Sequence, residues 1–289
     1  MGKRMFIDLK VKREVDVDTC FTFFNILNEV TPLHFPDKIN NYEPINIPFT
    51  SLDKDFLKKF CERTILFKKS SAMDGMISNR KGFIIHSSYK LEYKKNHKKG
   101  SEMNLSILSK LIQELSKNLF IEFGYVHELL EGEIEFAQAN GSAHRNVILF
   151  NSITLQKYIP DLYLCTVIGM EYVQEFGMEK LLSLPVPLVK KLSHEQVYFQ
   201  LVEDLENFTY EEVKVNREKI KEFLGKDYFF QVSKGRDYKY KRVYKEDIIE
   251  PTERFIVITD GKNGMTVVEE DKNKKPLTLF EKFLRFFKN

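Results

Sequence analysis

The densest run of apolar and aromatic residues in the chain lies at residues 160–185, PDLYLCTVIGMEYVQEFGMEKLLSLP. Prolines bound this run, and Gly169 and Gly177 divide it. A short apolar run bounded in this way is typical of a buried strand, so we expect a strand over 163–168. The residues between the two glycines place one apolar face at helical spacing, so we expect a short helix over 170–176. The run therefore predicts the centre of the core.

The composition allows one large domain or two small ones. The chain has 289 residues, of which 43% are hydrophobic and 30% are charged, so it can bury a core and stay soluble. The net charge of +3 is close to balance and favours neither nucleic acid nor an anionic membrane as a partner. No run of about 18 apolar residues occurs, so we expect no membrane span.

The cysteines favour a reducing compartment. Cys20, Cys61 and Cys165 are odd in number and far apart, and each lies among apolar residues. Such cysteines are typical of buried free thiols. The start of the sequence, MGKRMFIDLK, also lacks the hydrophobic region of a secretory signal, so we expect a cytoplasmic protein.

Two segments predict helices that pack on a sheet. Leucine and isoleucine recur at helical spacing over 102–119 and form one apolar stripe. Thr209 and Glu212 have the form of a capping box, which predicts a helix from there to Leu224, and Gly225 is a typical stop. We expect both helices to cover a sheet.

Strand patterns occur along the whole chain. They predict strands over 4–13, 65–67, 83–93, 147–150, 197–202, 228–232 and 238–244, and a hairpin that joins 255–259 to 265–268. We therefore expect an α+β fold, in which a largely antiparallel sheet packs against several helices. Prolines interrupt the pattern near 185–193. We accordingly divide the chain into an α+β core over 1–188 and a C-terminal α+β region over 189–289, which either continues the core or forms a second domain.

Four segments are less regular. The prolines between 31 and 50 predict an ordered loop. Residues 73–80 predict a turn or a mobile loop. Residues 125–136 fit a strand or a helix equally well. Residues 277–289 predict an amphipathic helix, for which we favour docking on the sheet over contact with a membrane surface.

Four carboxylates, Glu128, Glu131, Glu133 and Glu135, follow His127 in the sequence. His127 and Glu131 have the spacing of two metal ligands on one helix face, but no third neutral ligand lies near them. We therefore expect no metal here and interpret the segment as a solvated acidic face. Such a face would suit a basic partner, so these four glutamates are the predicted partner-binding residues.

A nuclease pattern is also present. Asp74 followed by Glu92-Tyr93-Lys94 provides two carboxylates to hold a divalent ion and a lysine to steady the developing charge. An acid followed two residues later by lysine recurs elsewhere in the chain, so an exposed strand face explains the pattern as well. No nucleophile–base arrangement, phosphate loop or cofactor motif occurs. We therefore expect no catalytic residues and no cofactor.

Lysine and tyrosine interleave over 238–244. This pattern suits a surface that stacks bases and binds phosphates. It is equally typical of an ordinary strand with tyrosine on one face and lysine on the other. We favour the strand and do not expect nucleic acid as a partner.

Residues 160–185 resemble a segment of bacterial polymorphic-toxin immunity proteins of the immunity protein 52 family. The matching residues are Pro160-Asp161-Leu162-Tyr163, Gly169, Glu171-Tyr172-Val173, Phe176-Gly177, Lys180-Leu181-Leu182 and Pro185. The resemblance implies an intracellular protein without enzymatic activity that binds a cognate toxin and blocks its active site. It also implies that Tyr163, Gly169, Tyr172 and Gly177 are core positions.

Three functions remain open at this point. The first is an inhibitor of immunity type that occludes the active surface of a cognate toxin. The second is a phage or mobile-element protein, acting as a monomer or a homo-oligomer, that inhibits a host defence complex. The third is a metal-dependent nuclease that uses Asp74, Glu92 and Lys94.

Overall fold

The computed structural model describes residues 4–70, 72–79, 86–94, 103–133, 155, 159–229, 231–232, 238–239, 255–259 and 265–269. The chain divides into two compact units, Met1–Lys245 and Glu246–Asn289. In the second unit, β13 (Phe255–Thr259) and β14 (Met265–Glu269) form an antiparallel hairpin. This confirms the predicted hairpin.

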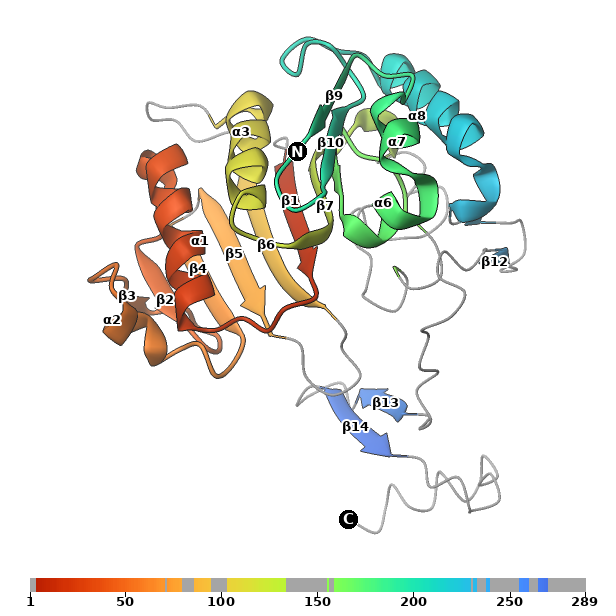
Figure 1. The fold of residues 1–289 in the computed structure, drawn as a ribbon. Coiled ribbons are helices and arrows are strands. Elements are labelled where there is room, and N and C mark those ends of the chain that lie inside the picture. The colour runs from red at the N-terminus through yellow and green to blue at the C-terminus, as the bar shows by residue number, and fades with distance from the viewer. Residues whose placement is uncertain are drawn as a thin grey trace. The chain divides into compact units, whose positions relative to one another are not determined.

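The first unit is built on one sheet of ten strands in the order β3-β2-β4-β5-β6-β1-β7-β8-β10-β9 (Figure 1). The strands are β1 (Arg4–Val11), β2 (Lys38–Asn40), β3 (Ile47–Pro48), β4 (Ile65–Lys69), β5 (Met73–Ser78), β6 (Ser87–Lys94), β7 (Ile121–Glu128), β8 (Cys165–Ile168), β9 (Leu188–Lys191) and β10 (Val197–Gln200). Every neighbouring pair is antiparallel, which confirms the predicted α+β class. The sheet continues past residue 188, because β9 begins there.

Helices flank this sheet. They are α1 (Val17–Val30), α2 (Lys54–Lys58), α3 (Leu105–Ser116), α6 (Met170–Phe176), α7 (Met178–Leu182) and α8 (Tyr210–Leu224), with the 3-10 turns η1 (Pro32–His34) and η3 (Lys226–Tyr228). Two short strands, β11 (Gln231–Val232) and β12 (Tyr238–Lys239), form a separate ladder. Within the described residues, no helix combines the length and the apolar character that crossing a membrane requires.

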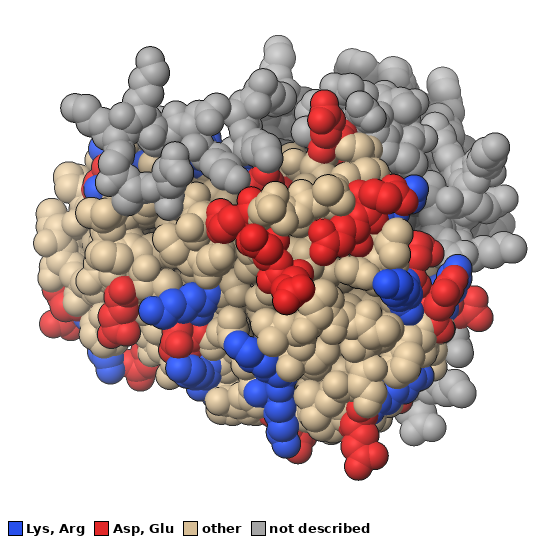
Figure 2. Space-filling model, turned by 90° about the horizontal axis from the view of Figure 1, so that it is seen from above, with Lys and Arg blue, Asp and Glu red and all other residues tan. Residues whose placement is uncertain are grey.

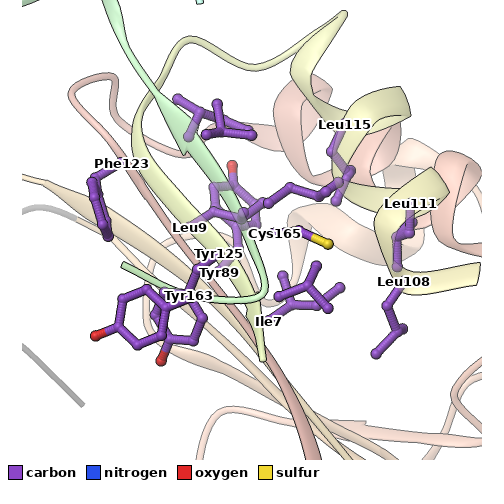
Figure 3. Close-up of a cluster of buried hydrophobic side chains, with 14 of the residues drawn as sticks. Ile7, Leu9, Tyr89, Leu108, Leu111, Leu115, Phe123, Tyr125, Tyr163 and Cys165 are labelled. Atoms are coloured by element: carbon purple, nitrogen blue, oxygen red, sulfur yellow. The ribbon is translucent and has the colours of Figure 1, made fainter. Parts of the chain in front are cut away.

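The apolar stripe of α3 packs on one face of the sheet. Leu108, Leu111 and Leu115 point toward Ile7 and Leu9 of the central strand β1 (Figure 3). All five side chains are buried. Helix α1 lies beside α3 on the same face (Figure 1). The predicted apolar stripe over 102–119 is therefore confirmed. Because α1 and α3 lie on the same face of the sheet, they do not cover its other face.

One prediction for an irregular segment was wrong. Residues 73–78 form strand β5 and not a loop, in which Met73 and Ile77 are buried on the same face and Gly75 between them lets the ring of Phe67 lie directly against the strand. The segment 31–50 is ordered and contains only short elements, η1, β2 and β3, so its prolines limit the length of the strands without preventing them.

The expected strand and helix around Gly169 are present as β8 and α6. A Cβ atom on Gly169 would lie 2.2 Å from the carbonyl oxygen of Ile121, so only glycine fits this approach to β7. Gly177 has a φ of +85°, which glycine adopts without strain. Tyr163 and Tyr172 are buried, as the family resemblance implied.

Candidate functional site

The four predicted partner-binding glutamates have different environments. Glu128 ends β7 and is buried. Glu131 is exposed at the start of a helical turn over 131–133, whereas Glu133 at its end is buried. Glu135 lies outside the described residues, as does the predicted helix over 277–289. Of the described three, only Glu131 is on the surface.

The carboxylate of Glu133 contacts two side chains, the imidazole of His127 and the guanidinium of Arg217. Nε2 of His127 lies 2.8 Å from Oε2 of Glu133, and Nη2 of Arg217 donates to its Oε1 at 3.0 Å. Burial by itself would raise the pKa of Glu133, but the contacts with His127 and Arg217 outweigh it and lower the pKa to about 2. Glu133 is therefore an ionised, paired group inside the fold.

Asp161 extends this network. Its carboxylate lies 2.9 Å from Nζ of Lys221 and 3.7 Å from Nη1 of Arg217, and it accepts from the backbone N–H of Leu162 at 2.8 Å. Burial opposes ionisation, yet the two cations lower the pKa of Asp161 below its ordinary range. The network fastens α8 to the loop that opens the 160–185 run, with Tyr163 of this loop stacked on Tyr125 of β7 at 3.9 Å between ring centroids.

The hypothetical metal pair of His127 and Glu131 does not form. Nδ1 of His127 accepts from the backbone N–H of Leu164 at 3.4 Å, so Nε2 donates to Glu133. Both ring nitrogens are therefore used within the fold. No group of three or more His, Cys, Asp or Glu side chains suited to a metal ion occurs within the described part of the chain.

Exposed carboxylates gather at the end of the sheet that holds the start of α3 and α8. We define this acidic end by Glu131, Glu203, Asp204, Glu206 and Glu211, all of which are exposed. Figure 2 shows Asp and Glu side chains across the middle of this face, with Lys and Arg mainly at its sides.

Local contacts bring these segments together. The backbone N–H and the hydroxyl of Ser106, in the first turn of α3, both donate to Oε1 of Glu206, at 3.3 and 3.1 Å. A Cβ atom on Gly132 would lie 2.5 Å from the ring of Tyr210, which starts α8. The turn over 131–133, the loop over 201–209 and the first turns of both helices therefore share one surface.

A hollow of about 330 Å³ opens in the acidic end. It is lined by Ser106, Ser109, Gln200, Glu203, Asp204 and Leu205. The hydroxyl of Ser109 and the amide of Gln200 are both bonded to the hydroxyl of Tyr198, at 2.6 and 2.7 Å. Glu203 and Asp204 make no ion pair among the residues that the structure describes. Oδ1 of Asp204 accepts from the backbone N–H of Glu206 at 2.8 Å, so the hollow presents two carboxylates that have no cationic partner within the described part of the chain.

The three residues of the nuclease pattern lie together on the sheet face opposite α1 and α3. Asp74 of β5 is directly opposite Glu92 of β6. Nζ of Lys94 lies 3.0 Å from Oδ2 of Asp74, and Arg4 forms an ion pair with Glu92. Each carboxylate therefore has a cationic partner within the fold.

A buried charged pair lies further along the same face. Nζ of Lys10 is 3.0 Å from Oδ1 of Asp8 and donates to the hydroxyl of Ser88 at 2.7 Å. Nζ of Lys90 lies 3.5 Å from Oδ2 of Asp8. Burial lowers the pKa of Lys10, and Asp8 opposes this shift. Sequence reasoning missed this pair, because alternating charges in a strand usually face water.

Sequence reasoning also missed the loop over 201–209, which supplies most of the acidic end. The available signal was the clustering of Glu203, Asp204 and Glu206 before the capping Thr209. Acidic residues before a helix are common, so this signal does not separate a binding surface from helix capping.

No family model matches the chain, and no curated protein matches it. Among solved structures, the chain is similar to the Pseudomonas aeruginosa T6SS protein PA0821, with 13% sequence identity and a TM-score of 0.49. The match covers 85% of this chain and 79% of that chain. A likeness of this size assigns neither a family nor a function to the chain.

Proposed function

We propose that the protein is a non-enzymatic binding protein that inhibits a cognate protein by occluding its active surface, and that its acidic end docks a basic surface of that partner. The observation that carries this proposal is that Glu203 and Asp204 are exposed at a hollow of about 330 Å³ and form no ion pair with any described residue. A positively charged patch on a partner would complement them.

The framework around the acidic end supports a preformed surface. Helix α3 is fixed on the sheet by its leucine stripe, and α8 is fixed by the Arg217 network. A rigid site loses little conformational entropy on binding, which favours tight inhibition. The immunity-type resemblance of residues 160–185 points to a toxin as the partner.

A capture experiment with a matched control tests the proposal. Tagged wild type, the variant Glu203→Gln/Asp204→Asn and the control Glu29→Gln/Asp55→Asn are used as bait in an extract of the native host. The control residues are exposed carboxylates on α1 and α2 and are not among the residues that define the acidic end. We expect wild type and control to retain one basic protein that the acidic-end variant retains at least about tenfold less well.

The captured protein is then assayed for toxicity in cells with and without co-expression of each variant. Protection by wild type and control, and its loss with Glu203→Gln/Asp204→Asn, would support inhibition through the acidic end. No stable protein partner, or equal retention by all three baits, would contradict the proposal. A captured defence effector in place of a toxin would support the phage or mobile-element alternative.

A metal-dependent nuclease is the second candidate function. The observation in its favour is that Asp74, Glu92 and Lys94 lie side by side on one sheet face. The test is cleavage of DNA and RNA by the purified protein with Mg²⁺, compared with Glu92→Ala. No cleavage, or cleavage that Glu92→Ala leaves unchanged, would exclude this function.

A further inference from the structure

Strand β9 is the last strand of the sheet beyond β10, and no strand pairs with its outer side within the described residues (Figure 1). In an antiparallel ladder, residues that bond to the neighbouring strand alternate with residues whose backbone groups point away from it. Leu192, directly after β9, donates its backbone N–H to the carbonyl oxygen of Gln196 at 2.7 Å. By alternation, Lys190 also bonds to β10, whereas the N–H and C=O groups of Val189 and Lys191 point outward.

The ladder on the other side of β10 gives the same result. Leu201, directly after β10, donates its backbone N–H to the carbonyl oxygen of Leu164 at 3.0 Å, in register with β8. Tyr198, which is opposite Lys190, therefore has its backbone groups on the side of β9. The outer edge of β9 thus offers two N–H and two C=O groups to a further strand.

The two ends of this edge differ in charge. At its far end, Lys190 and Lys191 are exposed and form no ion pair with a described residue. At its start, Leu188 is opposite Gln200, which lines the hollow of the acidic end. The two ends are about 10 Å apart at the usual rise of a strand. One extended segment can therefore reach both.

We propose that the partner adds an extended strand to the outer edge of β9, with a basic residue of that strand beside the hollow and an acidic residue beside Lys190 and Lys191. The inference rests on the proposed function and gives its partner a strand as well as a basic residue. Main-chain hydrogen bonds to Val189 and Lys191 hold the added strand, and the unlike charges at the two ends of the edge fix its orientation.

Charge favours such a partner over a second copy of this chain. Two copies of β9 that pair through both outward-facing residues place Val189 of one copy opposite Lys191 of the other. The two Lys190 side chains are then directly opposite each other, and like charges in this position are destabilising. Lysine on an edge strand accordingly protects against pairing between identical chains. A strand that carries a carboxylate at this position avoids the repulsion.

The first test needs no partner. Amide hydrogen exchange of the purified full chain, followed residue by residue by NMR, compares neighbouring residues of β9. We expect the N–H groups of Val189 and Lys191 to exchange at least about tenfold faster than that of Lys190, which bonds to β10. Equally slow exchange at all three would mean that the edge is already covered. That result would overturn this inference and leave the proposed function standing.

The second test uses the basic protein that wild type captures in the experiment above, produced in pure form. Lys191→Pro removes an outward N–H that makes no bond to β10, and Lys191→Ala is the matched control, which loses the same charge and keeps that N–H. We expect Lys191→Pro to bind the captured protein at least about tenfold more weakly than Lys191→Ala. In the wild-type complex, the amides of Val189 and Lys191 should become protected from exchange.

The outcomes separate the two proposals. Equal binding by Lys191→Pro and Lys191→Ala, with binding still weakened by Glu203→Gln/Asp204→Asn, would overturn the added strand and keep the acidic end as the docking site. Retention of no protein by wild type would overturn both proposals. Protected β10 amides in Lys191→Pro show that this variant keeps the sheet. If it does not keep the sheet, the wild-type complex decides, and unprotected Val189 and Lys191 amides there would overturn the inference.

Discussion

Nη2 of Arg217 lies 3.0 Å from Oε1 of Glu133, and this ion pair joins α8 to the helical turn that follows β7. Arg217 also reaches Asp161, so one guanidinium connects three segments that are distant in the sequence. Within the fold, Arg217 is the arginine partner of the buried Glu133, whereas the partly exposed Asp161 is also paired with Lys221 at 2.9 Å. The pair makes the position of α8, and with it the geometry of the acidic end, sensitive to a single side chain.

Replacing Arg217 with methionine should therefore destabilise the protein strongly. The variant leaves Glu133 buried without its arginine, while Asp161, which is partly exposed, keeps Lys221, and we expect a loss of about 3 kcal/mol in the free energy of unfolding. The control is Lys214→Met on the same helix, where an exposed lysine lies 3.6 Å from Glu211 and contributes less than about 0.5 kcal/mol. Urea unfolding measures both, and equal losses would contradict the assignment of Arg217 as the anchor of α8.

The acid sensitivity of the fold should depend on Glu133. Its pKa is lowered from the ordinary 4.5 to about 2, so its contribution to stability is fully present above pH 4.5 and is lost as the pH falls toward 2. The loss should amount to about 3 kcal/mol. Urea unfolding across this pH range should show a steeper loss for wild type than for Glu133→Gln. Parallel profiles for the two proteins would show that Glu133 is not the titrating group.

Two glycines of the apolar run should respond differently to alanine. A Cβ atom on Gly169 would lie 2.2 Å from the carbonyl oxygen of Ile121 and 2.6 Å from Cα of Glu122, which are backbone atoms that cannot turn away. We expect Gly169→Ala to cost at least about 3 kcal/mol. Gly177→Ala meets no neighbouring atom and should cost about 1–2 kcal/mol, through its positive φ alone. Thermal unfolding measures the loss of stability of both variants. A larger loss for Gly177→Ala than for Gly169→Ala would refute the packing argument.

The buried pair of Asp8 and Lys10 should show strong coupling. Lys10→Met removes the nearer cation from a buried carboxylate and should cost about 3 kcal/mol. Adding Asp8→Leu removes that carboxylate, so the double variant should lose at least about 1 kcal/mol less than the sum of the single losses. A double-mutant cycle in urea tests this coupling, and additive losses would mean that Lys90 and Ser88 alone satisfy Asp8.

Local sequence signals predicted some elements almost to the residue. Helix α8 begins at Tyr210 because the Thr209 hydroxyl accepts from the backbone N–H of Glu212 at 3.1 Å, and it ends before Gly225. Helix α6 matches the predicted 170–176 for a similar reason, since glycines bound it on both sides. These boundaries depend on neighbouring residues, which a sequence pattern contains.

The environment of the acidic segment could not be predicted in the same way. Glu133 looks like a surface residue in sequence, and it is buried because its cation, Arg217, is 84 positions away. The segment 125–136 was ambiguous because β7 is buried on both faces and so lacks an alternating pattern. The segment is a strand as far as Glu128, followed by a helical turn over 131–133. Long-range pairing of this kind leaves no local signal.

The place of β1 in the sheet has a consequence for how the chain must assemble. This strand precedes the other strands of the sheet in the chain, yet it pairs with β6 on one side and with β7 on the other. The second partner, β7, ends at Glu128. Both edges of β1 can therefore form their hydrogen bonds with neighbouring strands only after the chain has been synthesised as far as Glu128. Pairing between strands that are far apart in the sequence slows folding. Removal of β1 would leave two separate half-sheets, β3 to β6 and β7 to β9, each with a newly exposed edge.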